Sequence, residues 1–221
     1  MDLCRTKKVI PDIEKLKDKH VALFGLGGVG GYVAEALVRS GIGELTIVDG
    51  DAVEPSNVNR QLVALDGNIG ELKTDAMSRR LLAINPNLVL HPFNIFFLPE
   101  NSDELDFSKF DFVADAIDTV AAKLELIAKV NGEKIISCMG TGNRIDPTMI
   151  RIGDIFDTQG CPLAKIMRSQ LRKKGIAKLP VVYSAELPAK TPDRTPGSTA
   201  FVPGAAGLAM ASYIVKKLIS D

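Results

Sequence analysis

The chain has 221 residues, with 27 basic and 27 acidic side chains and therefore no formal net charge. This length and an apolar share of 46% fit one globular domain whose core needs no disulfides, and three cysteines without a CxxC pair argue against a four-cysteine zinc site and fit a reducing cytoplasm. No apolar run reaches the roughly 18 residues that cross a bilayer, so we expect no membrane partner.

Short apolar runs alternate with amphipathic stretches through the first 140 residues. Runs bounded by turn residues predict buried parallel strands, and apolar residues at helical spacing predict the helices between them. The predicted elements are a helix over 9–19, a strand over 20–24, a helix around 33–38, a strand over 44–49, a helix over 73–84, strands over 88–93 and 110–116, a helix over 120–131 and a strand over 134–138. This alternation indicates an α/β fold, a Rossmann-like, mostly parallel sheet with helices on both faces.

The pattern changes after residue 140. Residues 148–155 predict a strand of a different kind, and residues 161–175 predict a basic helix. Residues 180–201 form a proline-rich segment with strand-like ends (VVYSAE and STAFV) and a stretch at 188–197 that we expect to be mobile; a helix follows over 204–219. We expect a single domain over 1–221, with a Rossmann-like core at 1–140 and a C-terminal strand and helix extension at 141–221 on the substrate and dimer side.

A glycine-rich turn follows the first predicted strand. Gly25, Gly27 and Gly30 form a GxGxxG pattern, and Asp49 ends the next strand 19 residues after Gly30. The glycines let the backbone approach phosphates at a helix N-terminus, and the carboxylate can accept hydrogen bonds from ribose hydroxyls. The pattern predicts a site for adenosine and phosphates, and it fits an NAD-dependent oxidoreductase as well as an enzyme that uses ATP.

The segment after Asp49 favours ATP. It continues as a polar loop that supplies Asn57 and Arg60, and Lys73 begins the next helix. Two cations beside a phosphate site suit a triphosphate, because negative charge grows on its oxygens in the transition state. Asp118 closes a DAID turn at the carboxyl edge of the sheet, where a carboxylate can hold Mg²⁺.

Four elements occur in one order: GLGGVGG, VDGDAVEPSNVNRQ, Lys73 and DAID. On these the chain resembles the ubiquitin-activating-enzyme superfamily, whose bacterial members are the MoeB/ThiF/HesA adenylyltransferases. The resemblance implies that ATP adenylates a carboxylate with release of pyrophosphate in a homodimer. It implies catalytic roles for Arg60, Lys73, Asp118 (with Mg²⁺) and Arg5, the last donated by the partner subunit. It implies nucleotide binding by Gly25, Gly27, Gly28, Gly30, Asp49, Asp51, Asn57, Arg60, Lys73, Asp118 and Thr119, although Asp51, like Asp115, is also interpreted as a cap or surface charge.

The later segments SCMGTGNRIDPT, CPLAK, VYSAE, GS and FVP resemble one branch, the tRNA threonylcarbamoyladenosine dehydratases. In that branch ATP activates the carboxylate of the threonylcarbamoyl group on a tRNA adenosine, and an internal nitrogen displaces AMP to give a cyclic base. Activators of sulfur-carrier proteins usually carry two CxxC pairs, so no zinc is expected here. An internal nucleophile needs no enzyme thioester, and we interpret Cys138 and Cys161 as apolar fillers rather than nucleophiles.

The net charge of zero hides a division along the chain. Residues 1–118 carry 12 basic and 19 acidic side chains, and residues 119–221 carry 15 and 8. The candidate tRNA contacts on the basic helix are Lys165, Arg168, Arg172, Lys173 and Lys174, with a solvated helix face as the alternative. Tyr183 and Phe201 are candidates to stack on a base, with core packing favoured for Phe201.

Three other functions remain open from the sequence. The first is adenylation of the C-terminus of a ubiquitin-like sulfur-carrier protein. The second is an NAD-dependent oxidoreductase, and the third is a nucleotide-binding partner of a cysteine desulfurase system. His20 and His91 have no Ser, Cys or Asp partner pattern, so no catalytic triad is expected. A cytoplasmic enzyme that acts on tRNA is the interpretation we favour.

Overall fold

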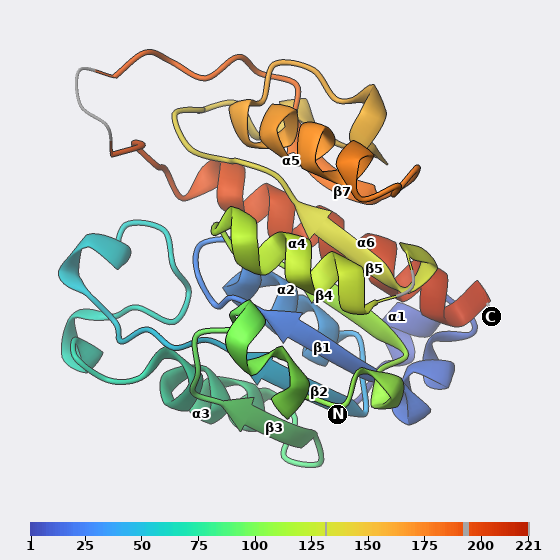
Figure 1. The fold of residues 1–221 in the computed structure, drawn as a ribbon. Coiled ribbons are helices and arrows are strands. Elements are labelled where there is room, and N and C mark those ends of the chain that lie inside the picture. Colours follow the sequence, from blue (N-terminus) through green and yellow to red (C-terminus); the bar gives the residue numbers. More distant parts are fainter. Residues whose placement is uncertain (131, 192–194, 221) are drawn as a thin grey trace.

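The computed structural model describes residues 1–130, 132–191 and 195–220. A seven-stranded sheet runs through them in the order β3-β2-β1-β4-β5-β7-β6 (Figure 1). The strands are β1 His20–Phe24, β2 Glu44–Val48, β3 Val89–Phe93, β4 Phe112–Asp115, β5 Ile135–Cys138, β6 Ile150–Asp154 and β7 Pro180–Ser184. Neighbouring strands pair in parallel except β6 and β7, so the strand expected to differ is the antiparallel edge strand. The predicted α/β fold is confirmed.

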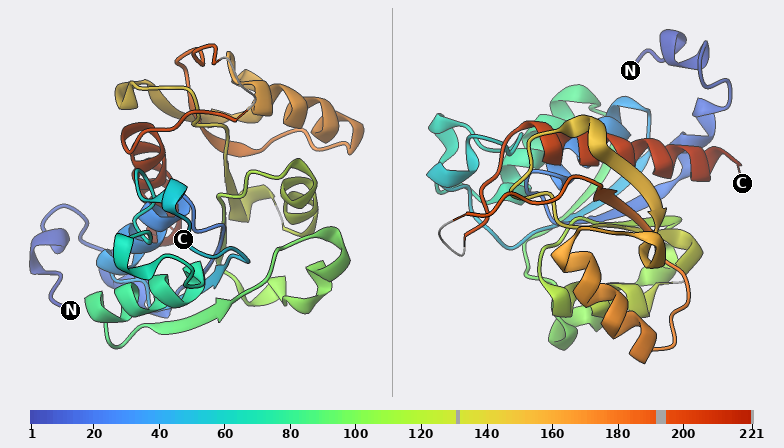
Figure 2. Two further views of the ribbon diagram at one scale, coloured as in Figure 1. Left: turned by 90° about the vertical axis from the view of Figure 1, so that its left-hand side faces the viewer. Right: turned by 90° about the horizontal axis from the view of Figure 1, so that it is seen from above.

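Helices cover both faces of this sheet (Figure 2). They are α1 Cys4–Lys7, α2 Gly30–Arg39, α3 Lys73–Ile84, α4 Val120–Lys129, α5 Pro162–Lys173 and α6 Phe201–Ser220. Successive strand residues point to opposite faces, so Val21 and Leu23 pack with α2, α3 and α6, whereas Ala22 and Phe24 pack with α4 and α5. Each face therefore has its own apolar core, and the sheet separates the two.

The segment before β1 is tighter than the expected helix over 9–19. It is a 3₁₀ helix, η1, over Ile13–Asp18, and the short helix α1 precedes it. Ile13 and Leu16 are both fully buried. Because a 3₁₀ helix has three residues per turn, this spacing places both side chains on one face toward the core.

The strand expected at STAFV is wrong. Helix α6 begins at Phe201, and Val202, Ala206 and Met210 are buried at helical spacing. Pro203 stands in the first turn, where a missing N–H leaves no helical hydrogen bond unmade. The stretch expected to be mobile, 188–197, includes residues 192–194, which lie outside the described residues.

Helix α6 is long and apolar enough to cross a membrane by length and composition alone, and 56% of its apolar window is buried within this molecule. It packs closely on α2: a Cβ at Gly207 would lie 2.5 Å from the backbone oxygen of Val29. The apolar side chains of α6 therefore contribute to the core on its face of the sheet.

The strand order reverses between β1 and β4, which lie side by side although β2 and β3 separate them in the sequence. In open α/β sheets such a reversal opens a crevice at the carboxyl ends of the strands. The segment after β2 and the segment before α6 both project from this end of the sheet, at the left of Figure 1. The fold thus brings the two polar segments singled out in the sequence to one edge.

Candidate nucleotide site

A cleft of about 910 Å³ lies at the carboxyl edge of the sheet. Its walls come from the glycine loop, the segment after β2, the start of α3, the DAID turn and the segments after β5 and before α6. Ten of the predicted nucleotide-binding residues line it: Gly25, Gly27, Gly28, Asp49, Asp51, Asn57, Arg60, Lys73, Asp118 and Thr119. Residues spread over nearly 100 positions of sequence are therefore gathered around one space.

The glycine loop owes its path to two close approaches. Gly25 has a φ of +91°, and a Cβ there would lie 2.8 Å from the backbone oxygen of Ala116. Gly30 does not line the cleft; it begins α2, and a Cβ there would lie 1.8 Å from the backbone oxygen of Gly25. Only glycine fits either position, and the result holds the N-terminus of α2 at the cleft, where a helix favours anions.

Asp49 is fixed by the backbone around it. One carboxylate oxygen accepts a hydrogen bond from the N–H of Leu26 at 2.6 Å, and the other accepts from the N–H of Asp51 at 2.8 Å. Burial raises the pKa of the Asp49 carboxyl, while the charge of Lys73 and the two N–H donors oppose that shift. Each oxygen keeps a second lone pair, so the group can still accept a hydrogen bond from a ribose hydroxyl.

Lys73 is the first residue of α3, and its Nζ lies 2.7 Å from a carboxylate oxygen of Asp51. The backbone N–H of Lys73 also donates to the carbonyl of Asp51 at 3.0 Å, so loop and helix start are held together. The lysine side chain is 5% exposed and the aspartate side chain 52%. A buried cation with a half-exposed partner at the cleft wall suits an exchange of that partner for a phosphate.

Arg60 and Asn57 are held within the loop between β2 and α3. Arg60 Nη1 donates to the carbonyl of Ser56 at 2.7 Å and to Asn59 Oδ1 at 2.9 Å. The side chain of Asn57 is buried, and its Oδ1 accepts from the N–H of Glu54 at 3.2 Å. Both residues line the cleft, and both also fix the loop that carries them.

A buried charged cluster lies behind the DAID turn, and the sequence analysis missed it. Lys123 Nζ donates to Asp115 Oδ2 at 3.0 Å, to Ser137 Oγ at 3.1 Å and to the carbonyl of Cys138 at 2.8 Å. Ser137 Oγ donates to the same Asp115 oxygen at 2.6 Å, and all three side chains are fully buried. Asp115 is therefore structural, as expected, but it is an internal ion-pair partner rather than a surface charge. The available signal was a lysine inside the apolar helix VAAKLELIAK.

Asp118 stands at the other end of this turn and is exposed to the cleft. Its Oδ1 accepts a hydrogen bond from Thr119 Oγ1 at 3.4 Å. An exposed carboxylate in a cleft that Arg60 and Lys73 also line is the type of oxygen ligand that Mg²⁺ takes.

Further lining residues were not predicted. Phe96 follows β3 and leaves a largely exposed ring at the cleft, a position with no motif to mark it. Gln61 also lines the cleft, and its Oε1 is buried without a hydrogen-bond partner among the described residues. Asn143, which follows the lining residue Gly142 and has a φ of 59°, accepts a hydrogen bond from the N–H of Gly197 at 2.6 Å through Oδ1, and this bond joins the segment after β5 to the one before α6.

Cys138 and Cys161 are both buried, and Cys138 is among the residues that line the cleft. Burial raises the pKa of the Cys138 thiol to about 12. A thiol with such a pKa remains protonated near neutral pH and is a poor nucleophile. The geometry is in accord with the interpretation of these cysteines as fillers.

The basic helix α5 divides into two kinds of side chain. Arg168 donates to the carbonyl of Thr158 at 2.9 Å, and the guanidinium of Arg172 lies over the ring of Phe156 at 5.3 Å. The other candidates, Lys165, Lys173 and Lys174, are exposed. The two arginines therefore support the fold of this region whether or not they meet a ligand.

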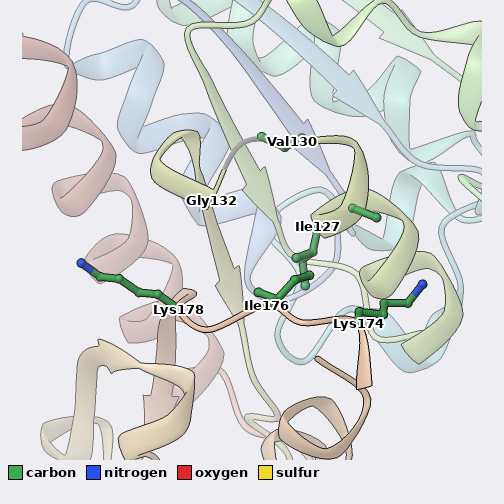
Figure 3. Close-up of a pocket in the computed structure, with 7 residues that line it drawn as sticks. Ile127, Val130, Gly132, Lys174, Ile176 and Lys178 are labelled. Atoms are coloured by element: carbon green, nitrogen blue, oxygen red, sulfur yellow. The ribbon is translucent and has the colours of Figure 1, made fainter. Parts of the chain in front are cut away.

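A second hollow, of about 450 Å³, lies between α4 and the chain that follows α5. Figure 3 shows Ile127 and Ile176 between Lys174 and Lys178, whose ammonium groups point to opposite sides. The hollow is an apolar depression with basic ends, and its lining residues include no acidic, histidine or cysteine side chain.

Two further expectations concern residues outside the cleft. Phe201 is 58% exposed at the start of α6, so the expectation that it packs in the core is wrong. Arg5 is exposed on α1. Leu3, directly before α1, packs against Gly41, which precedes β2: a Cβ at Gly41 would lie 2.6 Å from Leu3 Cδ1. Figure 2 shows α1 standing away from the rest of the molecule. Arg5 is thus at the amino edge of the sheet, away from its own cleft.

Comparisons with known proteins agree with one another. A family model described as ThiF family matches residues 7–221. The tRNA threonylcarbamoyladenosine dehydratase of Bacillus subtilis (strain 168) is 39% identical over an alignment of 232 positions, which covers 95% of this chain and 90% of that protein. Crystal structures of the E. coli tRNA N6-threonylcarbamoyladenosine dehydratase in complex with ATP and with AMP have TM-scores of 0.91 and 0.92 and identities of 32% and 31%. They cover 99% and 98% of this chain, and 93% of each solved chain.

Proposed function

The chain belongs to the ThiF family, and on that premise we propose that it is an ATP-dependent tRNA threonylcarbamoyladenosine dehydratase. The resemblance found in the motifs agrees with the family match. One observation carries the proposal: the chain has, over almost its whole length, the fold of an enzyme of that name that was crystallised with ATP and with AMP. The carboxyl edge of this sheet holds the cleft that Asp49, Arg60 and Lys73 line.

The alternatives left by the sequence are not favoured. An NAD-dependent oxidoreductase does not fit relatives named for a dehydratase and bound to ATP or AMP. Activation of a sulfur-carrier protein fits the same adenylation chemistry, but the relatives that match the chain over most of its length are named for the tRNA reaction. No feature of the described residues favours a non-catalytic partner of a cysteine desulfurase.

The nucleotide is held from three sides in this proposal. Asp49 accepts hydrogen bonds from the ribose, while the glycine loop at Gly25–Gly28 and the start of α2 meet the phosphates. Lys73 leaves Asp51 for the triphosphate, and Arg60 and Asn57 meet the phosphates from the loop. The cations Lys73 and Arg60 act at the atoms where negative charge grows during adenylation.

The reaction has two steps. A carboxylate oxygen of the threonylcarbamoyl group attacks the α-phosphorus, a new O–P bond forms, and the bond from that phosphorus to the bridging oxygen breaks and releases pyrophosphate. A nitrogen of the same modified base then attacks the activated acyl carbon, loses its proton, and displaces AMP with the electron pair of the broken C–O bond. The product is the cyclic base, and its mass is that of the substrate less one water.

The proposal assigns Mg²⁺ to the carboxylate of Asp118. The fit rests on an exposed carboxylate at the cleft, on the carboxyl edge of β4, with Thr119 beside it. When bound there, Mg²⁺ would neutralise phosphate charge and orient the pyrophosphate leaving group. Lys123 and Ser137 act at a distance in this scheme, because they hold Asp115 and thereby the turn that carries Asp118.

The proposed partners follow from the same reaction. tRNA phosphates meet three exposed lysines on and directly after α5, Lys165, Lys173 and Lys174, with support from Arg168 and Arg172. A homodimer places Arg5 of one protomer at the cleft of the other, since α1 lies away from its own cleft. We also propose a cysteine desulfurase system as a partner and the cytoplasm as the location.

The test is pyrophosphate release from ATP by the full chain with three acceptors: tRNA that carries threonylcarbamoyladenosine, the same tRNA without that modification, and a ubiquitin-like sulfur-carrier protein. We expect release only with the first. Arg60→Ala should abolish it and leave the far-UV circular dichroism unchanged. Release that depends on the carrier protein, or hydride transfer from NADH without ATP binding, would contradict the proposal.

A further inference from the structure

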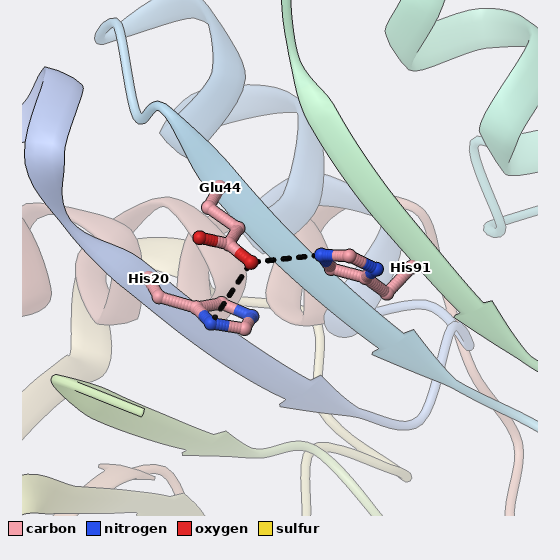
Figure 4. Close-up of side chains that lie close together, drawn as sticks. All are labelled: His20, Glu44 and His91. Atoms are coloured by element: carbon pink, nitrogen blue, oxygen red, sulfur yellow. Dashed lines mark hydrogen bonds and ion pairs between the residues drawn. The ribbon is translucent and has the colours of Figure 1, made fainter. Parts of the chain in front are cut away.

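Three polar side chains meet at the amino edge of the sheet, the edge away from the nucleotide cleft. His20 is the first residue of β1, Glu44 is the first residue of β2, and His91 lies in the middle of β3. These three strands are neighbours in the sheet. Figure 4 shows the two imidazole rings directed at the same carboxylate group of Glu44 from either side.

The strand register explains why they meet. His20 is paired with Glu44, and His91 is paired with Thr46, two residues farther along β2. Residues two apart on a strand share a face, so His20, Glu44, Thr46 and His91 all lie on one face of the sheet. The convergence is therefore a property of the backbone register rather than of one flexible side chain.

The distances describe three donor atoms around one point. His91 Nε2 lies 2.8 Å from Glu44 Oε1, and His20 Nδ1 lies 3.3 Å from the same oxygen. One ligand atom from each residue lies within 4.8 Å of the others, and among the described residues no other group of three or more such side chains meets this condition. Ligand atoms that surround one metal ion at about 2.0–2.2 Å from it have mutual separations of this kind.

A second layer orients the most buried ligand. His20 Nε2 lies 2.8 Å from the hydroxyl oxygen of Thr46, a buried side chain, and the Phe110 ring packs edge-on against His20 at 5.0 Å. If Nε2 carries the proton and donates it to Thr46, the lone pair of Nδ1 faces Glu44 and His91. Metal-binding histidines usually have such an outer hydrogen bond on the second ring nitrogen.

We propose that His20, Glu44 and His91 form a binding site for a divalent transition-metal ion, with Zn²⁺ as the ion that fits best. Two imidazole nitrogens and one carboxylate oxygen, without sulfur, are a donor set that Zn²⁺ accepts, and water completes the coordination because His91 and Glu44 are partly exposed.

The site acts on the fold rather than on the reaction at the cleft. A five-residue strand separates the two edges of the sheet by about 16 Å, at about 3.3 Å per residue. A metal ion held by β1, β2 and β3 joins three neighbouring strands, one of which, β3, is at the edge of the sheet. Binding to the folded state alone raises its stability. The proposal departs from the expectation of no zinc, which rested on the missing CxxC pairs, because no cysteine takes part in this site.

Calorimetric titration of the chelator-treated full chain with ZnCl₂, in excess Mg²⁺ and without ATP or tRNA, tests the site. We expect one saturable Zn²⁺ per chain. His91→Gln and Glu44→Gln should each weaken it at least tenfold, and Thr46→Val should weaken it about 10- to 100-fold through the outer hydrogen bond. The control is Cys4→Ser, which removes the exposed thiol of the chain and should leave the affinity unchanged.

A second readout guards against a variant that fails to fold. Co²⁺ should give a visible absorption spectrum of a low-symmetry nitrogen and oxygen site in the wild-type chain and in Cys4→Ser, and His91→Gln should lose that spectrum while its far-UV circular dichroism stays native. The proposal would be overturned if the wild-type chain showed no saturable binding, if His91→Gln bound Zn²⁺ as well as the wild type, or if Cys4→Ser lost the binding. None of these outcomes bears on adenylation, because neither substrate is present.

Discussion

Two lysine–aspartate pairs support the nucleotide site, one on the wall of the cleft and one in the core behind it, and their surroundings differ. Lys73 and Asp51 are 2.7 Å apart on the wall of the cleft, and half of the aspartate side chain is exposed. Lys123 and Asp115 are 3.0 Å apart behind the DAID turn, where both side chains are fully buried and the lysine also donates to Ser137.

The difference separates a replaceable contact from a fixed one. Asp51 can be hydrated when Lys73 turns to a phosphate, so that pair can open at little cost. Asp115 has no water to turn to, and removal of its partner would leave a buried charge. We infer that the first pair serves ligand binding and that the second holds the turn in place, and each can be tested separately.

The largest expected effect is on stability. Lys123→Met keeps the aliphatic stem and removes the ammonium group, so Asp115 is left without its partner, and we expect the free energy of unfolding to fall by about 3–5 kcal/mol. Urea denaturation measures it. Lys129→Met is the matched control on the same helix, because the partner of Lys129, Asp103, is almost fully exposed. Equal losses in the two variants would mean that the buried Lys123–Asp115 pair stabilises the fold no more than the exposed Lys129–Asp103 pair does.

The next effect is on catalysis. Lys73→Met should lower kcat for pyrophosphate release by about 100- to 1,000-fold, because a cation is lost where charge grows on the phosphates. Its free energy of unfolding should change by less than about 1 kcal/mol, since Asp51 is half exposed. Arg79 lies on the same helix as Lys73 and pairs at the surface with Glu71, so Arg79→Met should leave kcat at the wild-type level. If Lys73→Met lost as much stability as Lys123→Met, both lysine–aspartate pairs would be structural, which would contradict the account.

A smaller effect is expected at the loop that rests on the fixed turn. Gly30→Ala places a Cβ against the carbonyl of Gly25, whose own position is set by contact with Ala116 in the DAID turn. We expect a loss of about 1–3 kcal/mol in the free energy of unfolding and weaker ATP binding. Gly67→Ala is the control, because a Cβ there meets no atom within 4 Å. An unchanged affinity for ATP in Gly30→Ala would show that the loop adjusts freely.

The smallest effect is expected at Cys138. Cys138→Ala should retain adenylation, because burial raises the pKa of this thiol to about 12 and the hydrogen bond from Lys123 is made to the backbone carbonyl, which alanine keeps. Steady-state kinetics of the purified variant would measure it. Loss of the cyclisation step with adenylation intact would instead assign a covalent role to the thiol.

The sequence predicted what is encoded in contiguous stretches. Gly25, Asp49 and Arg60 lie in one contiguous stretch that runs from the end of β1 through α2 and β2 into the following loop, and local backbone rules place them at the cleft. The sequence analysis missed two groups: the buried cluster around Lys123, and the cluster of His20, Glu44 and His91. In both, side chains from different strands meet, and the register of these strands exists only in the folded sheet. The prediction of a strand at STAFV was wrong for a related reason. These residues begin helix α6, where Val202 is buried in a core that exists only in the folded chain.

The most direct test of the proposed function is mass spectrometry of nucleosides from tRNA that carries threonylcarbamoyladenosine, after incubation with the chain and ATP. The account predicts that the modified nucleoside is converted to a species lighter by one water, with one AMP and one pyrophosphate formed per conversion, and that Lys73→Met leaves it unconverted. A nucleoside that stays unchanged while the chain hydrolyses ATP or adenylates a carrier protein would contradict the account.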